Sequence, residues 1–225
     1  MPIPKNYNKN FFKNWTHDMA YILGFMYADG NMVKSKRGTH FVAVYSADKD
    51  ILVSMKKCFQ SEHKLTERRS LTGSVYRIQI GSKEWFSDLG KLGLFPNKTK
   101  RMQLPFVPRE YFGDFVRGYF DGDGNVWSGI INKHRKTPTK ILQSVFTSSS
   151  LEYLLSLREM LRSLGIVGGG VSAPKNTNYS RLMLSTKDAL KLYKIMYTVP
   201  HKLHLRRKKV VFEKFMKNCG SSSTG

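Results

Sequence analysis

Two ten-residue stretches decide the fold of this chain. Residues 21–30 read YILGFMYADG, and residues 115–124 read FVRGYFDGDG, so their closing glycines lie 94 residues apart. Two further likenesses follow in the same order: VYSA at 44–47 with VFTS at 145–148, and PNK at 96–98 with PHK at 200–202. The offset grows from 94 to 101 and then to 104, which predicts one duplicated unit whose second copy gained residues in its loops.

Each copy shows the same order of predicted elements, a helix, two strands, a helix, two strands and a helix, which is an αββαββα unit of an α+β fold. We expect an N-terminal half at 1–94, a linker at 95–108, a C-terminal half at 109–219 and a flexible tail at 220–225. The basic stretch at 202–217 is expected to form a terminal helix.

The two motifs carry small residues at helical spacing. Gly24 and Ala28 are four residues apart, and Gly118 and Gly122 repeat that spacing, so each pair lies on one helix face. Glycine inside a helix costs roughly 1 kcal/mol relative to alanine, so its presence there requires a reason. We expect the two motif helices to pack closely along these faces, and each to end at a glycine in the left-handed conformation.

This packing predicts a metal site. Asp29 and Asp123 would arrive side by side at two helix C-termini, where the helix dipoles are already negative. A divalent ion such as Mg²⁺ relieves that repulsion by accepting carboxylate oxygens, with waters and phosphate oxygens completing its shell. One Asp-Gly alone would be read as a helix cap beside a turn, but its duplication behind a small-residue face favours the metal site.

The charge of the chain favours an anionic partner. Its 38 Lys and Arg residues face 16 acidic residues over a length of 225, a formal net charge of +22. Nucleic acid is the first candidate, because each neutralised phosphate releases a condensed counterion. Ribosome association and anionic membranes are the alternatives.

Other features of the sequence predict an intracellular protein. Its two cysteines, Cys58 and Cys219, lie far apart and outside any CxxC pattern, which is typical of a reducing compartment. Residues 1–10 lack the apolar run of a signal peptide, and no stretch approaches about 18 uninterrupted apolar residues. The host organelle or cell type is not readable from the sequence.

Both motifs resemble the LAGLIDADG motif of the LAGLIDADG homing endonucleases, and their pairing in one chain resembles the monomeric branch. LGLFPNKTKRMQLP at 92–105 and LHLRRKK at 203–209 also resemble segments of that family. The resemblance implies pseudo-twofold αββαββα units, two saddle-shaped antiparallel sheets on DNA and a central interface of two motif helices. It also implies intron encoding and metal-dependent double-strand cleavage across the minor groove of a long asymmetric target. Mg²⁺ or Mn²⁺ is the expected cofactor, and Ca²⁺ is expected to bind without supporting cleavage.

The resemblance assigns the metal to the acid before each final glycine. Asp29 and Asp123 match that position, with the backbones of Ala28 and Gly122 beside them. The preceding acid position of the family is occupied by Tyr27 and Asp121, a departure that leaves the metal-binding acids untouched.

Supporting catalytic residues are less well defined by the sequence. The family places a lysine near each centre, for which the repeat offers Lys98 and Lys202, with Arg206 and Lys208 as rivals in the second half. These cations could equally be phosphate clamps. Ser46 and Thr147 match a polar active-site position, or could cap the helices that follow.

The strands are expected to read DNA. Alternation along 76–80 places Arg77 and Gln79 on one face, and these side-chain types pair bidentately with guanine and adenine. Arg181 is placed comparably. Weaker candidates, each as readily a solvated surface residue, are Lys34, Lys36, Arg68, Arg135, Lys140 and Gln143. The terminal helix, with Arg206, Arg207, Lys208 and Lys209, is expected to clamp the DNA backbone, whereas Phe25, Met26, Phe120 and Trp127 are expected in the core.

Two binding functions remain as alternatives to the endonuclease. The chain could be an RNA splicing maturase, with its host intron RNA as partner, or a regulator that binds DNA without cleaving it. Both motif acids are present, which favours the enzyme.

Overall fold

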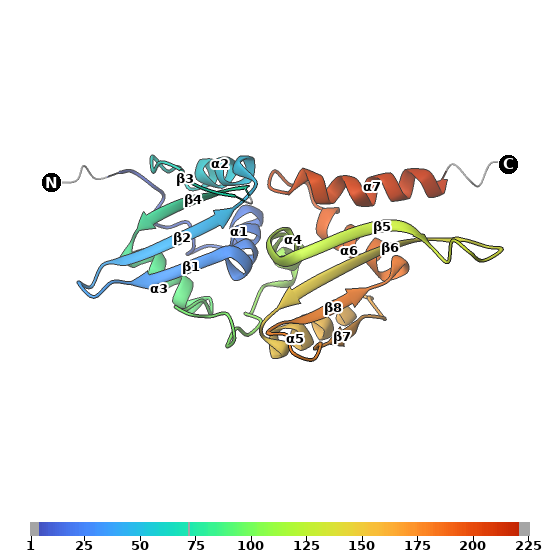
Figure 1. Ribbon diagram of the computed structural model, residues 1–225. Coiled ribbons are helices and arrows are strands. Elements are labelled where there is room, and N and C mark those ends of the chain that lie inside the picture. Colours follow the sequence, from blue (N-terminus) through green and yellow to red (C-terminus); the bar gives the residue numbers. More distant parts are fainter. Residues whose placement is uncertain (1–4, 72, 221–225) are drawn as a thin grey trace. The chain divides into compact units, whose positions relative to one another are not determined.

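The computed structural model describes residues 5–71 and 73–220, and the side chains of 5–71 and 73–218 (Figure 1). Residues 221–225 of the expected tail, Thr72 and the side chain of Cys219 lie outside that description. The chain divides into two compact units. Unit 1 ends at Gly122 and also takes in His201–His204, and unit 2 comprises Asp123–Pro200 and the chain from Leu205 onward.

Unit 1 holds the first predicted αββαββα series. Its elements are α1 (His17–Asp29), β1 (Gly30–Lys34), β2 (His40–Ser46), α2 (Lys49–Cys58), β3 (Thr66–Ser70), β4 (Gly73–Gly81) and α3 (Lys83–Lys91). The strands form one antiparallel sheet in the order β1-β2-β4-β3. Side-chain hydroxyls cap the N-termini of α1 and α3: Thr16 Oγ1 accepts the Met19 N–H at 3.1 Å and Ser82 Oγ accepts the Trp85 N–H at 3.0 Å.

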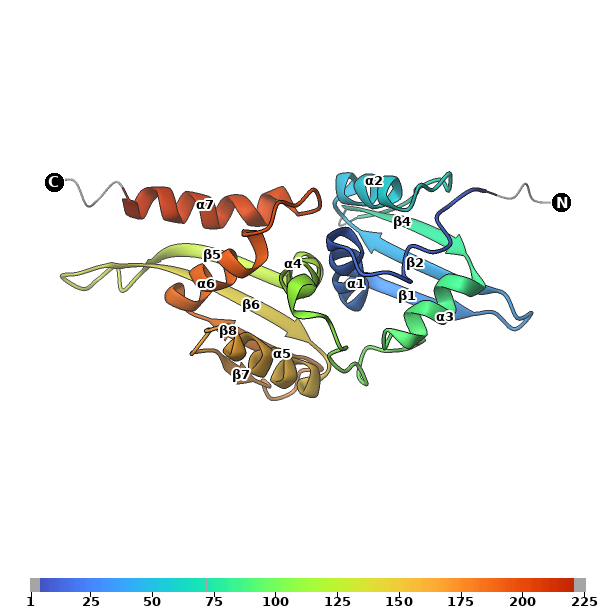
Figure 2. The same cartoon turned by 180° about the vertical axis from the view of Figure 1, so that it is seen from behind.

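Alternation of side chains gives this sheet a core face and an open face. Met32, Val42, Val44, Ile78 and Ile80 are each at most 4% exposed and share the face that the helices of unit 1 cover (Figure 2). The residues between them in sequence therefore point to the opposite face, on which no helix from the described part of this unit packs.

Unit 2 repeats the same order. The helix that leads into it is α4 (Phe112–Asp123), which follows a short 3₁₀ turn at Arg109–Tyr111 and lies in unit 1 up to Gly122. Then come β5 (Gly124–Ile131), β6 (Thr139–Ser148), α5 (Leu151–Ser163), β7 (Gly170–Ser172), β8 (Ser180–Leu184), α6 (Thr186–Tyr197) and α7 (Arg206–Gly220). The sheet order is β5-β6-β8-β7, the counterpart of unit 1, so the predicted duplication of the αββαββα order is confirmed.

The expected start of the terminal helix at residue 202 is wrong, because α7 begins at Arg206. Residues 201–205 are instead irregular, with Leu203 and Leu205 at most 4% exposed. The carbonyl of Leu203 accepts a hydrogen bond from Arg117 Nε at 3.0 Å. That carbonyl therefore accepts from a residue distant in sequence, and His201–His204 group with unit 1.

Within unit 1, α1 and α4 pack backbone against backbone. A Cβ at Gly24 would lie 2.0 Å from the Phe115 carbonyl oxygen, and one at Gly118 would lie 1.9 Å from that of Tyr21. One at Gly122 would lie 2.3 Å from the Ala28 Cβ. All three distances are far inside van der Waals contact, so only glycine fits and the predicted small-residue interface is confirmed.

Two expectations about the motifs need correction. Gly30 has φ −89° and ψ 150°, so it is not a left-handed terminator; α1 runs directly into β1. Glycine is required there because a Cβ would lie 2.5 Å from the Met26 carbonyl oxygen. Phe25, Met26 and Phe120 are buried as expected, but Trp127 is 47% exposed, because it sits on the open face of the second sheet.

Candidate functional site

The first motif acid lies in a polar cavity of unit 1. Asp29 ends α1, is half-buried, and lines a cavity of about 390 Å³ together with Ala28, Asn97 and Lys98. Lys98 Nζ donates a hydrogen bond to the Ala28 carbonyl oxygen at 3.3 Å. The last turn of α1, all of it described, holds no basic residue, so the Lys98 ammonium supplies the positive charge at this negative helix end.

A local turn brings Lys98 to this position. Asn97 has φ +56°, in the left-handed region that Asn tolerates better than most residues. Residues 96–97 thus form a turn directly before Lys98. Two predicted site residues that are 69 positions apart in sequence, Asp29 and Lys98, therefore line one cavity.

The second motif acid lies at the start of unit 2. Asp123 ends α4 with an exposed side chain, and the next residue, Gly124, begins β5. The carbonyl oxygen of Gly124 accepts a hydrogen bond from Lys208 Nζ at 2.6 Å. Lys208 is only 5% exposed and comes from the first turn of α7, which packs against β5.

Lys208 is thus a cation that unit 2 brings to its own Asp-Gly pair. Lys202, which the repeat suggested, is exposed and groups with unit 1 beside Leu203. Arg206, the other rival, is also exposed.

The donors next to each acid suit a hard divalent cation. A carboxylate and a backbone carbonyl are oxygen ligands, as Mg²⁺ prefers, and Mg²⁺ takes its remaining ligands from water and substrate phosphate. Within residues 5–71 and 73–220 no three His, Cys, Asp or Glu side chains gather to hold a metal ion by themselves. The carboxylate oxygens of Asp29 and Asp123 are of the ligand type that Mg²⁺ takes together with water and phosphate oxygens.

Strand pairing corrects the expected equivalence of Ser46 and Thr147. Gly30 pairs with Val44 and Gly124 with Phe146, so Ser46 corresponds to Ser148, one residue beyond Thr147. Ser46 Oγ accepts the Asp48 N–H at 3.0 Å and Ser148 Oγ accepts the Ser150 N–H at 3.1 Å. Both serines thus support the residue that precedes a helix. The error arose because the likeness of VYSA to VFTS matched residue types, whereas the register follows from hydrogen bonding.

The open face of the first sheet gathers the strongest base-reading candidates. Arg77 and Gln79 alternate with the buried Ile78 and Ile80, as predicted. Arg77 pairs with Tyr45 on one side and Thr66 on the other. Arg77, Tyr45 and Thr66 line a groove of about 540 Å³ together with Arg68 and the carboxylate residue Glu67, whereas Gln79 lies outside it.

Two further candidates of unit 1 lie elsewhere. Lys34 lies two residues after the buried Met32, so both side chains point to the same face of β1. Lys34 pairs with His40, whose ring packs on Phe86 of α3. It therefore points to the helix-covered side at the end of its strand. Lys36 is exposed in the turn between β1 and β2.

The open face of the second sheet has the same kind of residues. Thr147 pairs with Arg181, and Gln143 pairs with Trp127, all on the side away from the buried Leu142 and Leu182. Arg77 and Arg181 thus occupy matching register positions opposite Tyr45 and Thr147 in their own sheets.

The remaining cations of unit 2 are divided between surface and packing roles. Arg135 is exposed in the turn between β5 and β6. Lys140 has the opposite parity from Gln143, and its ammonium lies 5.5 Å from the Phe215 ring centre of α7. Arg206 and Arg207 are exposed, whereas Lys209 is half-buried and lies 3.7 Å from Glu213.

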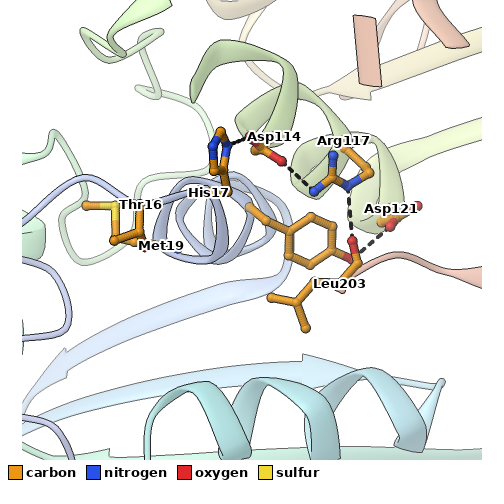
Figure 3. A network of polar contacts seen from close by, with 8 residues as sticks. Thr16, His17, Met19, Asp114, Arg117, Asp121 and Leu203 are labelled. Atoms are coloured by element: carbon orange, nitrogen blue, oxygen red, sulfur yellow. Dashed lines mark hydrogen bonds and ion pairs between the residues drawn. The ribbon is translucent and has the colours of Figure 1, made fainter. Parts of the chain in front are cut away.

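Sequence reasoning missed a buried polar network in unit 1 (Figure 3). Arg117, 2% exposed, donates to Asp114 at 2.5 Å and to the Leu203 carbonyl, while His17 Nδ1 lies 2.7 Å from the other Asp114 oxygen. Tyr21 donates to Asp121 at 2.7 Å. The signal in the sequence was a set of polar residues on otherwise apolar helix faces, whose partners sequence spacing alone does not reveal.

Tyr27 and Asp121, which lie two residues before the closing aspartate of their motifs, have different surroundings. Tyr27 is 1% exposed, burial raises the pKa of its hydroxyl above the ordinary value, and that hydroxyl donates to the Leu92 carbonyl at 2.8 Å. Asp121 is 1% exposed and accepts from Tyr21. Both side chains contribute to the packing of the motif helices within unit 1.

Comparison with known proteins agrees with this architecture. Residues 112–197 match a family model described as a LAGLIDADG-like domain. A probable translation initiation factor IF-2 of Thermococcus kodakarensis is 27% identical over 200 residues, which cover 84% of this chain. The chain spans only 15% of the length of that relative.

Solved structures of DNA-bound nucleases have the same fold. The meganuclease I-SmaMI bound to uncleaveable DNA aligns with a TM-score of 0.60 and 13% identity over 88% of either chain. The LAGLIDADG meganuclease I-AabMI bound to uncleaved DNA gives 0.62 and 12% over 91% of each. The LAGLIDADG homing endonuclease I-LtrWI bound to target DNA gives 0.56 and 13% over 93% of this chain and 92% of that one.

No helix in the described part of the chain has the length and apolar character needed to span a membrane. The strand order of both sheets, the glycine contacts of the motif helices, the match over residues 112–197 and the structural alignments all agree. Residues 112–197 thus match a LAGLIDADG-like domain, and the chain has the α+β fold of the solved LAGLIDADG nucleases to which it is similar.

Proposed function

We propose that this protein is a metal-dependent, site-specific DNA endonuclease. The observation that carries the proposal is a repeated arrangement: in each unit, a helix-ending aspartate adjoins a backbone carbonyl that binds a lysine ammonium. The pairs are Asp29 with Lys98 in unit 1 and Asp123 with Lys208 in unit 2.

Each acid would hold a divalent ion beside a scissile phosphate. Asp29 with the Ala28 carbonyl, and Asp123 with the Gly122 carbonyl, are the protein oxygens proposed for this role. The bound ion would polarise the phosphate and lower the pKa of an attacking water. The ammonium groups of Lys98 and Lys208 would stabilise the negative charge that develops on the phosphate oxygens.

The two open sheet faces would hold the duplex. Arg77, Gln79, Gln143 and Arg181 are on these faces, and Arg and Gln are suited to guanine and adenine edges. The net charge of +22 supports an extended grip on phosphates. The two faces differ in sequence, Gln79 in one sheet corresponding to Met183 in the other, so we propose an asymmetric target bound by a monomer.

One selection experiment tests this function. The protein is incubated with a randomised duplex library in Mg²⁺, Mn²⁺ or Ca²⁺, and the cut molecules and the uncut molecules that stay bound to the protein are sequenced separately. We expect one long asymmetric site cut on both strands with Mg²⁺ or Mn²⁺, and binding alone with Ca²⁺. Binding of a specific site with no cleavage in any metal would instead identify a non-cleaving regulator.

A further inference from the structure

Unit 1 contains a second pocket whose residues take no part in the proposed cleavage. It has a volume of about 420 Å³ and lies between Trp15, the end of α3 and the chain at 101–106. The buried Tyr27 and the turn glycine Gly93 form part of its wall. It shares Phe95 with the Asp29 cavity but includes neither Asp29 nor Lys98.

Four aromatic residues of the described chain line this pocket, namely Trp15, Tyr27, Phe95 and Phe106. Phe106 is 84% exposed, although a large apolar side chain gains free energy when it leaves water. It lies in the sequence LPFVP, where Pro105 and Pro108 restrict the backbone on either side. Trp15 is held by a near-parallel stack on Tyr111, with centroids 6.0 Å apart and planes at 13°. The Trp15 ring is therefore held by Tyr111 before any ligand binds, whereas the Phe106 ring stands largely in solvent.

Cations accompany the rings. Arg101 is exposed, and its guanidinium lies 5.1 Å from the centre of the Phe95 ring. Lys91, also exposed, lines the same pocket, as does the amide of Gln103. Among the described residues that line the pocket there is no carboxylate.

We propose that this pocket binds an unpaired nucleotide of a single-stranded nucleic acid. The base would stack on the exposed aromatic faces, and its phosphates would lie against Arg101 and Lys91. Rings and cations together are how proteins hold single strands, and the ring faces are useful only to a base that has left a duplex stack. Lys91 Nζ already lies 3.9 Å from a carboxylate oxygen of Asp88. An apolar peptide would offer no anion to the exposed guanidinium of Arg101, so the observations favour a nucleotide.

The proposal does not depend on cleavage and is tested by direct binding. Fluorescent eight-residue oligouridine and oligothymidine are titrated into the full-length protein and into two variants, Phe106→Ala and Arg101→Ala. Both positions are exposed, so folding should be retained, which thermal melting checks. Matched controls are Val167→Ala, a 78% exposed apolar residue, and Lys187→Ala, an exposed cation.

We expect Phe106→Ala to weaken binding on the order of tenfold or more, as loss of one stacked base does. Arg101→Ala should lower the slope of log affinity against log salt by about 0.7, the value for one phosphate contact on a single strand. Crosslinking of 4-thiouridine oligonucleotide should map to residues 95–106 or Trp15. Binding of both oligomers would indicate a general single-strand site, and binding of oligouridine alone an RNA site.

Equal loss in the variants and the matched controls would overturn the proposal, as would crosslinks confined to the sheets. Unchanged oligonucleotide binding by both variants, with displacement of an apolar fluorescent probe by peptide, would assign the pocket to a protein partner instead. The Phe106→Ala protein should cleave its DNA site as fast as the wild type does. The test of the nucleotide pocket is therefore independent of the test of the proposed endonuclease activity.

Discussion

The two motif centres use different parts of the chain to obtain the same pair of charges. In unit 1, Lys98 comes from a loop, is half-buried, and reaches the carbonyl of the residue before Asp29. In unit 2, Lys208 comes from a helix, is 95% buried, and reaches the carbonyl of the residue after Asp123. The aspartates are related by the duplication, but the lysines are not. A duplicated scaffold can therefore keep its acids in register while each half finds its cation separately.

Removal of either acid is the strongest way to break this comparison. Asp29→Asn and Asp123→Asn should each reduce double-strand cleavage on the order of 10³-fold, because the charge that holds the ion is lost. A supercoiled plasmid with one target site separates nicked from linear product. If each aspartate serves the cleavage of one strand, both variants should produce nicked plasmid. Full linearisation by either variant would mean that its acid holds no essential metal.

The lysines should differ in stability more than in catalysis. Lys98→Ala and Lys208→Ala should each slow cleavage about 10²-fold, as loss of one charge-stabilising donor does. Lys208→Ala should also lower the Tm by roughly 4–8 °C, since a buried side chain of this size contributes about 2 kcal/mol. Lys98→Ala should change it by less than about 2 °C.

Lys202→Ala is the matched control for both lysine variants, because Lys202 is exposed. The Lys202→Ala protein should cleave DNA at a rate within about twofold of the wild type. If Lys202→Ala slowed cleavage and Lys208→Ala did not, Lys202 would be the catalytic lysine of the second half, as the sequence repeat suggested, and the assignment of Lys208 from the structure would be wrong.

The helix pair on which both acids depend can be tested at its tightest point. Gly118→Ala places a Cβ 1.9 Å from the Tyr21 carbonyl oxygen, which should cost about 1–3 kcal/mol and lower the Tm by roughly 2–4 °C per kcal/mol. Gly90→Ala in α3 is the control, because its Cβ would meet nothing within 4 Å. Gly93 would be a poor control, since its φ is +84° and a Cβ would lie 2.6 Å from the Tyr27 hydroxyl. Equal melting temperatures for the two variants would contradict the close helix contact.

The smallest effects should distinguish the two sheets. Arg77→Ala and Arg181→Ala should each relax base preference by about 1–3 kcal/mol at a few adjacent positions, in different halves of the target. Arg207→Ala should weaken all sites alike. Lys140→Ala should leave the profile unchanged, because its ammonium packs on Phe215. Selection from a randomised duplex library reads all four outcomes, and an unchanged profile for Arg77→Ala would exclude base contact by that side chain.

The sequence predicted what depends on local spacing. The four-residue spacing of small residues after Gly24 and Gly118 predicted the contact between the motif helices. The alternation of Arg77 with Ile78 predicted the open face of the sheet. Both patterns can be read from a few neighbouring residues. The start of α7 and the position of Lys208 could not be predicted in this way. They depend on a carbonyl of residue 203 that binds Arg117 and on a carbonyl of residue 124 that binds Lys208. Trp127 was misplaced because residue type favours burial, whereas strand parity put it on the open face.

The hydrogen bond from Arg117 to Leu203 also has a consequence for the order in which the protein is made. The two residues are 86 positions apart, and the whole of residues 123–200 is synthesised between them. At roughly 5–20 residues per second, a ribosome needs about 4–17 s to cover that distance. During that interval the Arg117 guanidinium has Asp114 nearby but lacks the carbonyl that accepts from its Nε. Unit 1 begins to form first, yet its packing is completed only after residues 123–200 have been made.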